Sequence, residues 1–301
     1  MMLFYHPSYS ALSLPPRHRF PIQKYVLLKD QLVQLQLQNK LVCPSKVNIE
    51  SLLLCHDANY VQSFINGTLS EKAIRKMGFP WSKALVERTL YSVGGSIEAA
   101  NCALKHGVAA NLSGGYHHAH KGFGSGFCII NDFAVAACYL IQQALAETIV
   151  IFDCDVHQGD GTASILTERS DIITCSIHCE QNFPRNKAES DYDFPLAANA
   201  QDEAYLDTVH QALSLVCRLH SPDLILYNAG ADIYKQDELG LLNVSLDGVL
   251  ARDKLVMDYC RQNNIPMAAA MGGGYQKNIT QLVDVHKQFF VALTANPAIM
   301  I

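Results

Sequence analysis

The sequence predicts an α/β protein with a mainly parallel β-sheet that is flanked by helices on both faces. Five short apolar runs are typical of strands, at residues 108–112, 148–152, 172–177, 224–227 and 267–271. Segments with helical spacing separate several of these runs, at residues 132–146, 204–219 and 246–261. Because strands that alternate with helices usually join into parallel sheets covered on both faces, we expect this architecture here.

The rest of the chain indicates no further division. The first hundred residues are more helical, notably at 86–106, and we expect them to pack around one end of the sheet. The segment 183–194, which carries a proline near each end, predicts a loop. No internal repeat, low-complexity tract or linker interrupts the sequence, so residues 1–301 are expected to form a single domain.

The composition excludes several classes of protein. Of the 301 residues 49% are hydrophobic and 17% charged, which is too apolar for a disordered chain and sufficient for a large core. The net charge is −5 and Lys and Arg form no long blocks, so no nucleic-acid partner is expected. A mildly acidic surface weakly favours a cationic substrate.

Cysteine spacing and apolar content bear on the cellular compartment. Ten cysteines are scattered rather than spaced as pairs, and a chain of this size needs no disulfides, so we interpret them as reduced. No apolar stretch is long enough for a membrane span, and the N-terminus lacks the pattern of a signal peptide. We therefore expect a cytoplasmic protein without a membrane partner, and no motif predicts its oligomeric state.

The most informative segment, residues 150–161, begins as a buried strand and ends in several ionisable side chains. Side chains of an extended strand alternate between its faces, so Asp153, Asp155 and His157 project to the same side. Converging carboxylates are costly to bury without a cation among them. Mixed oxygen and nitrogen ligands suit zinc or a similar divalent metal, so the segment predicts a metal site.

Polar turns follow the predicted strands along the whole chain. Ligand sites of open α/β sheets lie outside the carboxyl ends of the strands, so these turns are expected to face one crevice. The side chains expected to converge there are His117, His118, Asp155, His157, Asp232 and Tyr275.

Five motifs match one known family in the family order. They are GGYHHA at 114–119, SGFC at 125–128, DCDVHQGDG at 153–161, GAD at 230–232 and GGGY at 272–275. The chain resembles the histone deacetylase and acetylpolyamine amidohydrolase family, which has an arginase-like α/β fold. Gln158 and Tyr116 stand where many eukaryotic members carry His and Trp, so the chain is most similar to class IV and bacterial members.

The resemblance implies a role for each polar side chain of the crevice. The zinc ligands would be Asp155, His157 and Asp232. The active-site histidines and the carboxylates behind them would be His117 with Asp153 and His118 with Asp160. Tyr275 would polarise the substrate carbonyl, and His118 would act as general base and then as general acid. Because a carboxylate raises and a nearby zinc lowers the pKa of an imidazole, we expect His118 to titrate near neutrality.

The resemblance also implies a structural ion and a substrate channel. The inner potassium site of the family matches groups of Asp153, Asp155, His157, Ser176 and Ile177. The walls of its acyl-lysine channel match Gly126, Phe127, Phe183 and Gly273. Arg169 lies at a position that matches part of a second potassium site, so only the inner site is predicted.

The predicted function is zinc-dependent hydrolysis of N-acyl amides, with acyl-lysine in proteins or peptides as the substrate. Fe²⁺ is an alternative metal, and an acetylpolyamine or another small N-acyl amine is an alternative substrate. A binuclear ureohydrolase would need bridging carboxylates, for which Asp153 and Asp160 are the candidates, and would leave Tyr275 unused. A non-catalytic metal sensor is disfavoured because ligands, base and Tyr275 occur together.

Overall fold

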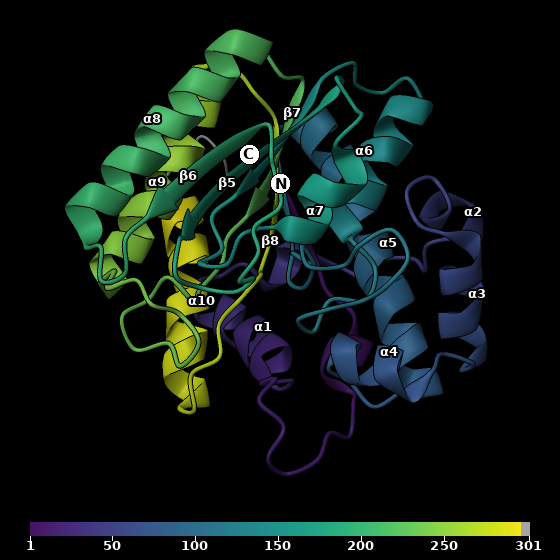
Figure 1. The fold of residues 1–301 in the computed structure, drawn as a ribbon. Coiled ribbons are helices and arrows are strands. Elements are labelled where there is room, and N and C mark those ends of the chain that lie inside the picture. The colour runs from purple at the N-terminus through teal and green to yellow at the C-terminus, as the bar shows by residue number, and fades with distance from the viewer. Residues whose placement is uncertain (296–301) are drawn as a thin grey trace.

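The structure, a computed structural model, describes residues 1–295, and these contain one eight-stranded sheet (Figure 1). All strand pairs run parallel, and the order across the sheet is β2-β1-β3-β8-β7-β4-β5-β6. The strands are β1 (Met2–Phe4), β2 (Leu41–Val42), β3 (Val108–Asn111), β4 (Ile149–Asp153), β5 (Ile172–Cys179), β6 (Tyr192–Leu196), β7 (Leu224–Asn228) and β8 (Met267–Ala270). The predicted α/β class with a mainly parallel sheet is confirmed.

Helices cover both faces of the sheet, as Figure 1 shows. One face packs against α1, α8, α9 and α10, and the other packs against α5 and α6. The α-helices are α1 (Lys24–Gln34), α2 (Ile49–Leu52), α3 (Ala58–Asn66), α4 (Glu71–Met77), α5 (Lys83–His106), α6 (Asp132–Gln142), α7 (Asp160–Leu166), α8 (Asp202–His220), α9 (Leu246–Gln262) and α10 (Ile279–Thr294). None of the helices in residues 1–295 combines the length and the apolar character that crossing a bilayer requires.

Alternation of side chains along the strands produces these two layers. In β4, Val150 and Phe152 belong to the core beneath α8, α9 and α10, whereas Ile149 and Ile151 belong to the core beneath α5 and α6. Both sets are apolar because a parallel sheet covered on both faces is buried on both faces. This is why the central strands are continuous apolar runs in the sequence.

Three strands near the sheet edges were not predicted from the sequence. β1 and β2 lie within the first hundred residues, which were expected to be helical. The predicted loop at 183–194 is wrong at its end, because β6 begins at Tyr192 and forms the other edge. Pro195 is tolerated in β6 because an edge strand has a side without ladder hydrogen bonds. Such short edge strands show too little alternation to be recognised from sequence.

The carboxyl ends of four neighbouring strands, β3, β8, β7 and β4, lie in one row, and β5 continues three residues past it. The register pairs Asn111 with Ala270, Ala270 with Asn228, and Asn228 with Asp153, which in turn pairs with Ser176. The polar turns that follow these strands therefore leave the sheet along a single edge. This is the arrangement that places a ligand site at the carboxyl ends of parallel strands.

Candidate active site

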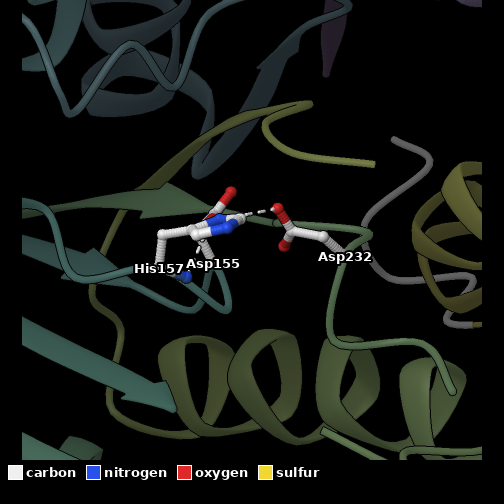
Figure 2. Close-up of side chains that lie close together, drawn as sticks. All are labelled: Asp155, His157 and Asp232. Carbon is white, nitrogen blue, oxygen red and sulfur yellow. Dashed lines mark hydrogen bonds and ion pairs between the residues drawn. The ribbon is translucent and has the colours of Figure 1, made fainter. Parts of the chain in front are cut away.

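Two loops bring three potential metal ligands together at this edge (Figure 2). Asp155 and His157 follow β4, and Asp232 follows β7. His157 Nδ1 lies 3.0 Å from Asp155 Oδ1 and 3.3 Å from Asp232 Oδ2. The Val156 backbone N–H donates to Asp232 Oδ1 at 3.0 Å, which ties the two loops together. All three side chains are buried, with ligand atoms within 4.8 Å of one another.

The electrostatics of this cluster favour a bound cation. Burial alone would lower the pKa of His157, but hydrogen bonds and charge from Asp155 and Asp232 raise it to about 10. Burial would raise the pKa of Asp155, but His117 and His157 lower it to about 2. Asp232 Oδ2 is buried and makes no directed hydrogen bond. Two carboxylates and one imidazole fit a divalent metal such as zinc.

His117 lies beside the cluster and against the carboxylate expected from the sequence. Its Nδ1 donates to Asp153 Oδ2 at 2.6 Å, and its Nε2 lies 3.7 Å from Asp155 Oδ1. Burial would lower the pKa of His117, but Asp153 and Asp155 raise it to about 9, so the ring is cationic at neutral pH. Asp153 is fixed in turn because Asn228 Nδ2 donates to its Oδ1 at 2.9 Å.

His118 and Asp160 form the second expected pair, with Nδ1 donating to Asp160 Oδ1 at 2.6 Å. Burial and the charge of neighbouring His117 lower the pKa of His118 to about 4. The sequence suggested a value near neutrality, but the structure differs because Asp160 does not compensate for burial and for His117. The imidazole is therefore neutral at neutral pH. Since Nδ1 carries its proton, Nε2 is the free acceptor.

A third histidine binds the same carboxylate and was not identified from the sequence. His120 Nε2 lies 3.2 Å from Asp160 Oδ2, so Asp160 bridges His118 and His120. The His120 ring stacks on Phe123 with centroids 4.4 Å apart, and Lys76 Nζ lies 3.3 Å from the Phe123 centroid. No local pattern distinguishes His120 from an ordinary loop histidine, because its partner lies 40 residues away.

Tyr275 faces the cluster from the turn after β8. Its ring centroid lies 6.4 Å from that of His157 and 5.8 Å from that of Phe127. Its backbone N–H donates to Asp237 Oδ2 at 2.7 Å, a contact that the sequence analysis did not identify. Burial, reinforced by the charges of nearby carboxylates, raises the pKa of Tyr275 well above its ordinary value. The phenol therefore remains a protonated hydrogen-bond donor.

A buried lysine, Lys24, stabilises the turn before Tyr275 and was not identified from the sequence. Lys24 Nζ donates to the Gly273 carbonyl. A Cβ at Gly273 would collide with Asp232 Oδ2, and its φ of +49° also favours glycine. Gly273 borders an inner cavity of about 20 Å³, beyond the cluster, and not the outer cleft that the resemblance implied.

An open cleft of about 770 Å³, which we call the mouth cleft, leads from the surface to the cluster. Three of the predicted channel residues line it, namely Gly126, Phe127 and Phe183. It also reaches His118, His157 and Tyr275. The Phe183 ring meets the His118 ring edge to face, with centroids 4.8 Å apart. Gly126 has no room for a side chain, because a Cβ would lie 2.6 Å from His118 Cδ2.

The residues of the predicted potassium site lie at and after the end of β4 and within the neighbouring strand β5. The register pairs Asp153 with Ser176, and both line a small cavity of about 10 Å³. Ser176 Oγ also lies 3.0 Å from His178 Nδ1. Ile177 follows Ser176 in β5, and Asp155 and His157 follow β4. The structure brings Asp153 and Ser176 together, and the potassium ion stays a prediction.

Arg252 contacts both loops that carry the proposed metal ligands and was not identified from the sequence. Its Nη1 donates to the Gly230 carbonyl at 2.6 Å and lies 3.4 Å from the Cys154 carbonyl. Its guanidinium pairs with Asp253 at 3.0 Å, and Asp253 also accepts from Tyr227 Oη at 2.6 Å. Gly230 and Cys154 each lie within two residues of a proposed ligand, so the contacts of Arg252 with their carbonyls fix the spacing of the two loops.

Comparisons with known proteins identify the family of this chain. The histone deacetylase domain family matches residues 18–289. The chain belongs to the histone deacetylase family. An uncharacterized protein of Picosynechococcus sp. is 42% identical over 287 residues and 94% of each chain. Histone deacetylase 2 of Arabidopsis thaliana is 28% identical, over 93% of this chain and 76% of that protein.

A solved structure has the same fold. The crystal structure of an HDAC homolog complexed with SAHA has a TM-score of 0.84 and 24% identity, and it covers 98% of this chain and 84% of that chain. The predicted membership of the deacetylase and acetylpolyamine amidohydrolase superfamily is confirmed. The family identifies the chain as a hydrolase of the deacetylase and amidohydrolase type.

Proposed function

We propose that the chain is a zinc-dependent deacylase that removes short acyl groups from lysine side chains of peptides or proteins, with residues 1–301 as one catalytic domain. The observation that carries the proposal is the convergence of the metal cluster, neutral His118 and protonated Tyr275 on one aromatic-walled cleft. Turnover of an acetyl-lysine peptide by the purified protein tests it. Absence of turnover with zinc and with Fe²⁺ would contradict it.

In this proposal Asp155, His157 and Asp232 hold one divalent metal, with zinc as the default and Fe²⁺ as the alternative. When bound, the metal supplies Lewis-acid polarisation of the amide carbonyl. Two anionic ligands cancel the formal charge of a divalent ion and weaken this polarisation. Hydrogen-bond donors from the protein must therefore contribute as well.

His118 is the proposed general base. Its neutral ring, with Nε2 free, accepts the proton of the attacking water, and the protonated ring then returns a proton to the leaving amine nitrogen. Asp160 keeps Nδ1 protonated through both steps. Cationic His117 donates a hydrogen bond to the developing negative charge, and the Tyr275 hydroxyl donates to the former carbonyl oxygen.

Replacing Tyr275 with Phe deletes only the hydroxyl. The donor interacts more strongly with an oxyanion than with the ground-state amide, so we expect kcat to fall by about 10²–10³ with a smaller change in KM. Steady-state kinetics on an acetyl-lysine peptide measure this effect. Tyr139→Phe in α6, outside the mouth cleft, serves as the control and is expected to match wild type. A near-wild-type kcat for Tyr275→Phe would remove this residue from the mechanism.

The inner cavity supports a short acyl group. Its volume of about 20 Å³ is bordered by aromatic and buried side chains that include Phe20, Tyr25 and Tyr116. A space of this size accommodates about one water molecule or methyl group. Acetyl is therefore the proposed acyl group, because a longer chain would have to displace these rings.

Two further parts of the proposal concern the structural ion and the compartment. One potassium ion is proposed beside Asp153 and Ser176, with Asp155, His157 and Ile177 contributing, because Asp153 and Ser176 are paired across β4 and β5 and line one small cavity. A cytoplasmic location is proposed from the cysteine pattern.

His120 is proposed as a positioning residue that acts through Asp160. Removing its ring frees Asp160 Oδ2, so we expect His120→Ala to lower kcat roughly tenfold while KM stays constant, because the His118 ring loses its fixed orientation. His120→Gln retains a donor and is expected to recover most of the loss. Lys121→Ala, the exposed neighbour, is the control. Equal losses in the Ala and Gln variants would refute the positioning role.

The binuclear ureohydrolase is disfavoured by the contacts of its candidate bridging carboxylates. Asp153 binds His117, and Asp160 binds both His118 and His120. Neither carboxylate is free to bridge a second metal. The site therefore supports a mononuclear amidohydrolase better.

A further inference from the structure

The charge around the mouth cleft differs in sign from that of the whole chain. The chain carries a net charge of −5. The Lys and Arg side chains that line the mouth cleft, Lys76 and Arg185, are exposed and form no ion pair within residues 1–295. Net charge alone favours a cationic substrate, but it says nothing about where the charges lie.

Of the two acidic side chains that line the mouth cleft, only Glu238 has a charged partner, Lys277, at 2.9 Å. Asp160 is buried and accepts hydrogen bonds from His118 and His120, and neutral His118 leaves its charge in place. Lys187 does not line the mouth cleft, and its Nζ donates to three backbone carbonyls of the loop that carries Phe183. Lys76 and Arg185 outnumber the single carboxylate without a charged partner, so the charge facing an incoming substrate is positive.

A second cleft of about 570 Å³ adjoins the mouth cleft and shares Glu238, Leu239 and Tyr275 with it. It adds two further exposed cations, Arg17 and Arg19, which likewise have no ion-pair partner in the described part of the chain. We call Lys76, Arg185, Arg17 and Arg19 the cationic rim.

We infer that the cationic rim selects acyl-lysines that lie in acidic peptide segments and disfavours acylated polyamines. This inference rests on the proposed function, because it assumes that an acyl-lysine enters between Phe127 and Phe183. With the amide at His118 and Tyr275, the peptide backbone lies at the entrance of the mouth cleft, which Lys76 and Arg185 line. Acidic neighbours of the lysine then meet unpaired cations.

Polyamines present the opposite charge to this rim. Their remaining amines are protonated at neutral pH, as the ordinary lysine pKa of about 10.4 indicates. A polyamine bound through its acyl end would place these ammonium groups in the mouth cleft beside Lys76 and Arg185. Like charges there lower the rate of productive encounter.

The test uses three acetyl-lysine peptides that differ only in the two residues flanking the lysine, which are Glu, Gln or Lys, together with N-acetylspermidine. We expect kcat/KM to follow the order Glu, Gln, Lys, with about a tenfold range that narrows as salt increases, and acetylspermidine to be the poorest substrate. Fluorescence anisotropy with labelled peptides measures binding in the same order, independently of turnover.

Charge-reversal variants test whether the cationic rim causes the preference for acidic peptides. The double variant Lys76→Glu/Arg185→Glu is expected to reverse the order of kcat/KM among the three peptides. Arg185→Glu alone is expected to reduce the differences in kcat/KM between them. Lys105→Glu/Lys254→Glu changes the net charge equally at exposed sites outside both clefts and is expected to retain the wild-type order of the peptides.

The outcomes separate the two proposals. Turnover without a charge preference, or equal effects in the test and control doubles, would overturn the cationic rim and leave the deacylase assignment intact. A charge order in binding without any turnover would overturn the deacylase assignment and leave the rim intact.

Discussion

Replacing Asp232 with Asn is expected to remove the bound metal and the activity together. Asn keeps the shape of the side chain and an acceptor for the Val156 N–H, but it loses the anionic charge that attracts the cation. We expect elemental analysis to find no divalent metal above background in this variant. We also expect kcat to fall by at least about 10³, since a metal supplies several kcal/mol and each 1.4 kcal/mol is a factor of ten.

A matched control and a second readout make this prediction specific. Asp207→Asn, on the exposed surface of α8, is expected to keep both metal and activity. A chelator is expected to lower the Tm of the wild type but not of Asp232→Asn, because a ligand stabilises only the state that binds it. Full metal content in Asp232→Asn would refute the ligand assignment. Two equivalents of metal in the wild type would favour a binuclear site.

His118→Ala is expected to retain the metal and to lower kcat by about 10²–10⁴, the usual contribution of a positioned acid or base. The reason is that His118 is the neutral histidine of the pair, whereas His117 carries a pKa of about 9 and is already protonated. Metal content and steady-state kinetics on an acetyl-lysine peptide measure the two halves of the prediction.

His210→Ala, at an exposed position of α8, is the control and is expected to change neither quantity. If kcat of His118→Ala is unchanged and only KM rises, then His118 is a binding residue and proton transfer belongs to another group. If the metal is lost as well, the variant does not separate base from ligand, and the conservative His118→Gln is expected to retain metal with the same loss of kcat.

The sequence by itself determined the central strands, the main helices and the order of the polar turns. Apolar runs such as the one ending at Asp153 are local, and buried parallel strands need no partner to be recognised. The position of Asp155, His157 and Tyr275 at strand ends also followed from local order, because parallel strands end at one edge of a sheet. Short edge strands such as β6 were missed, since few of their side chains are buried.

Tertiary structure alone decided which side chains support the site and what charge its entrance presents. His120, Asp237 and Arg252 are ordinary polar residues in the sequence, and their partners lie 40, 38 and 22 residues away. The neutral state of His118 depends on burial and on the charge of His117, which sequence spacing does not specify. Hydrophobic periodicity encodes which face of an element is buried, but contacts between distant loops and the grouping of surface charges are set only when the elements pack.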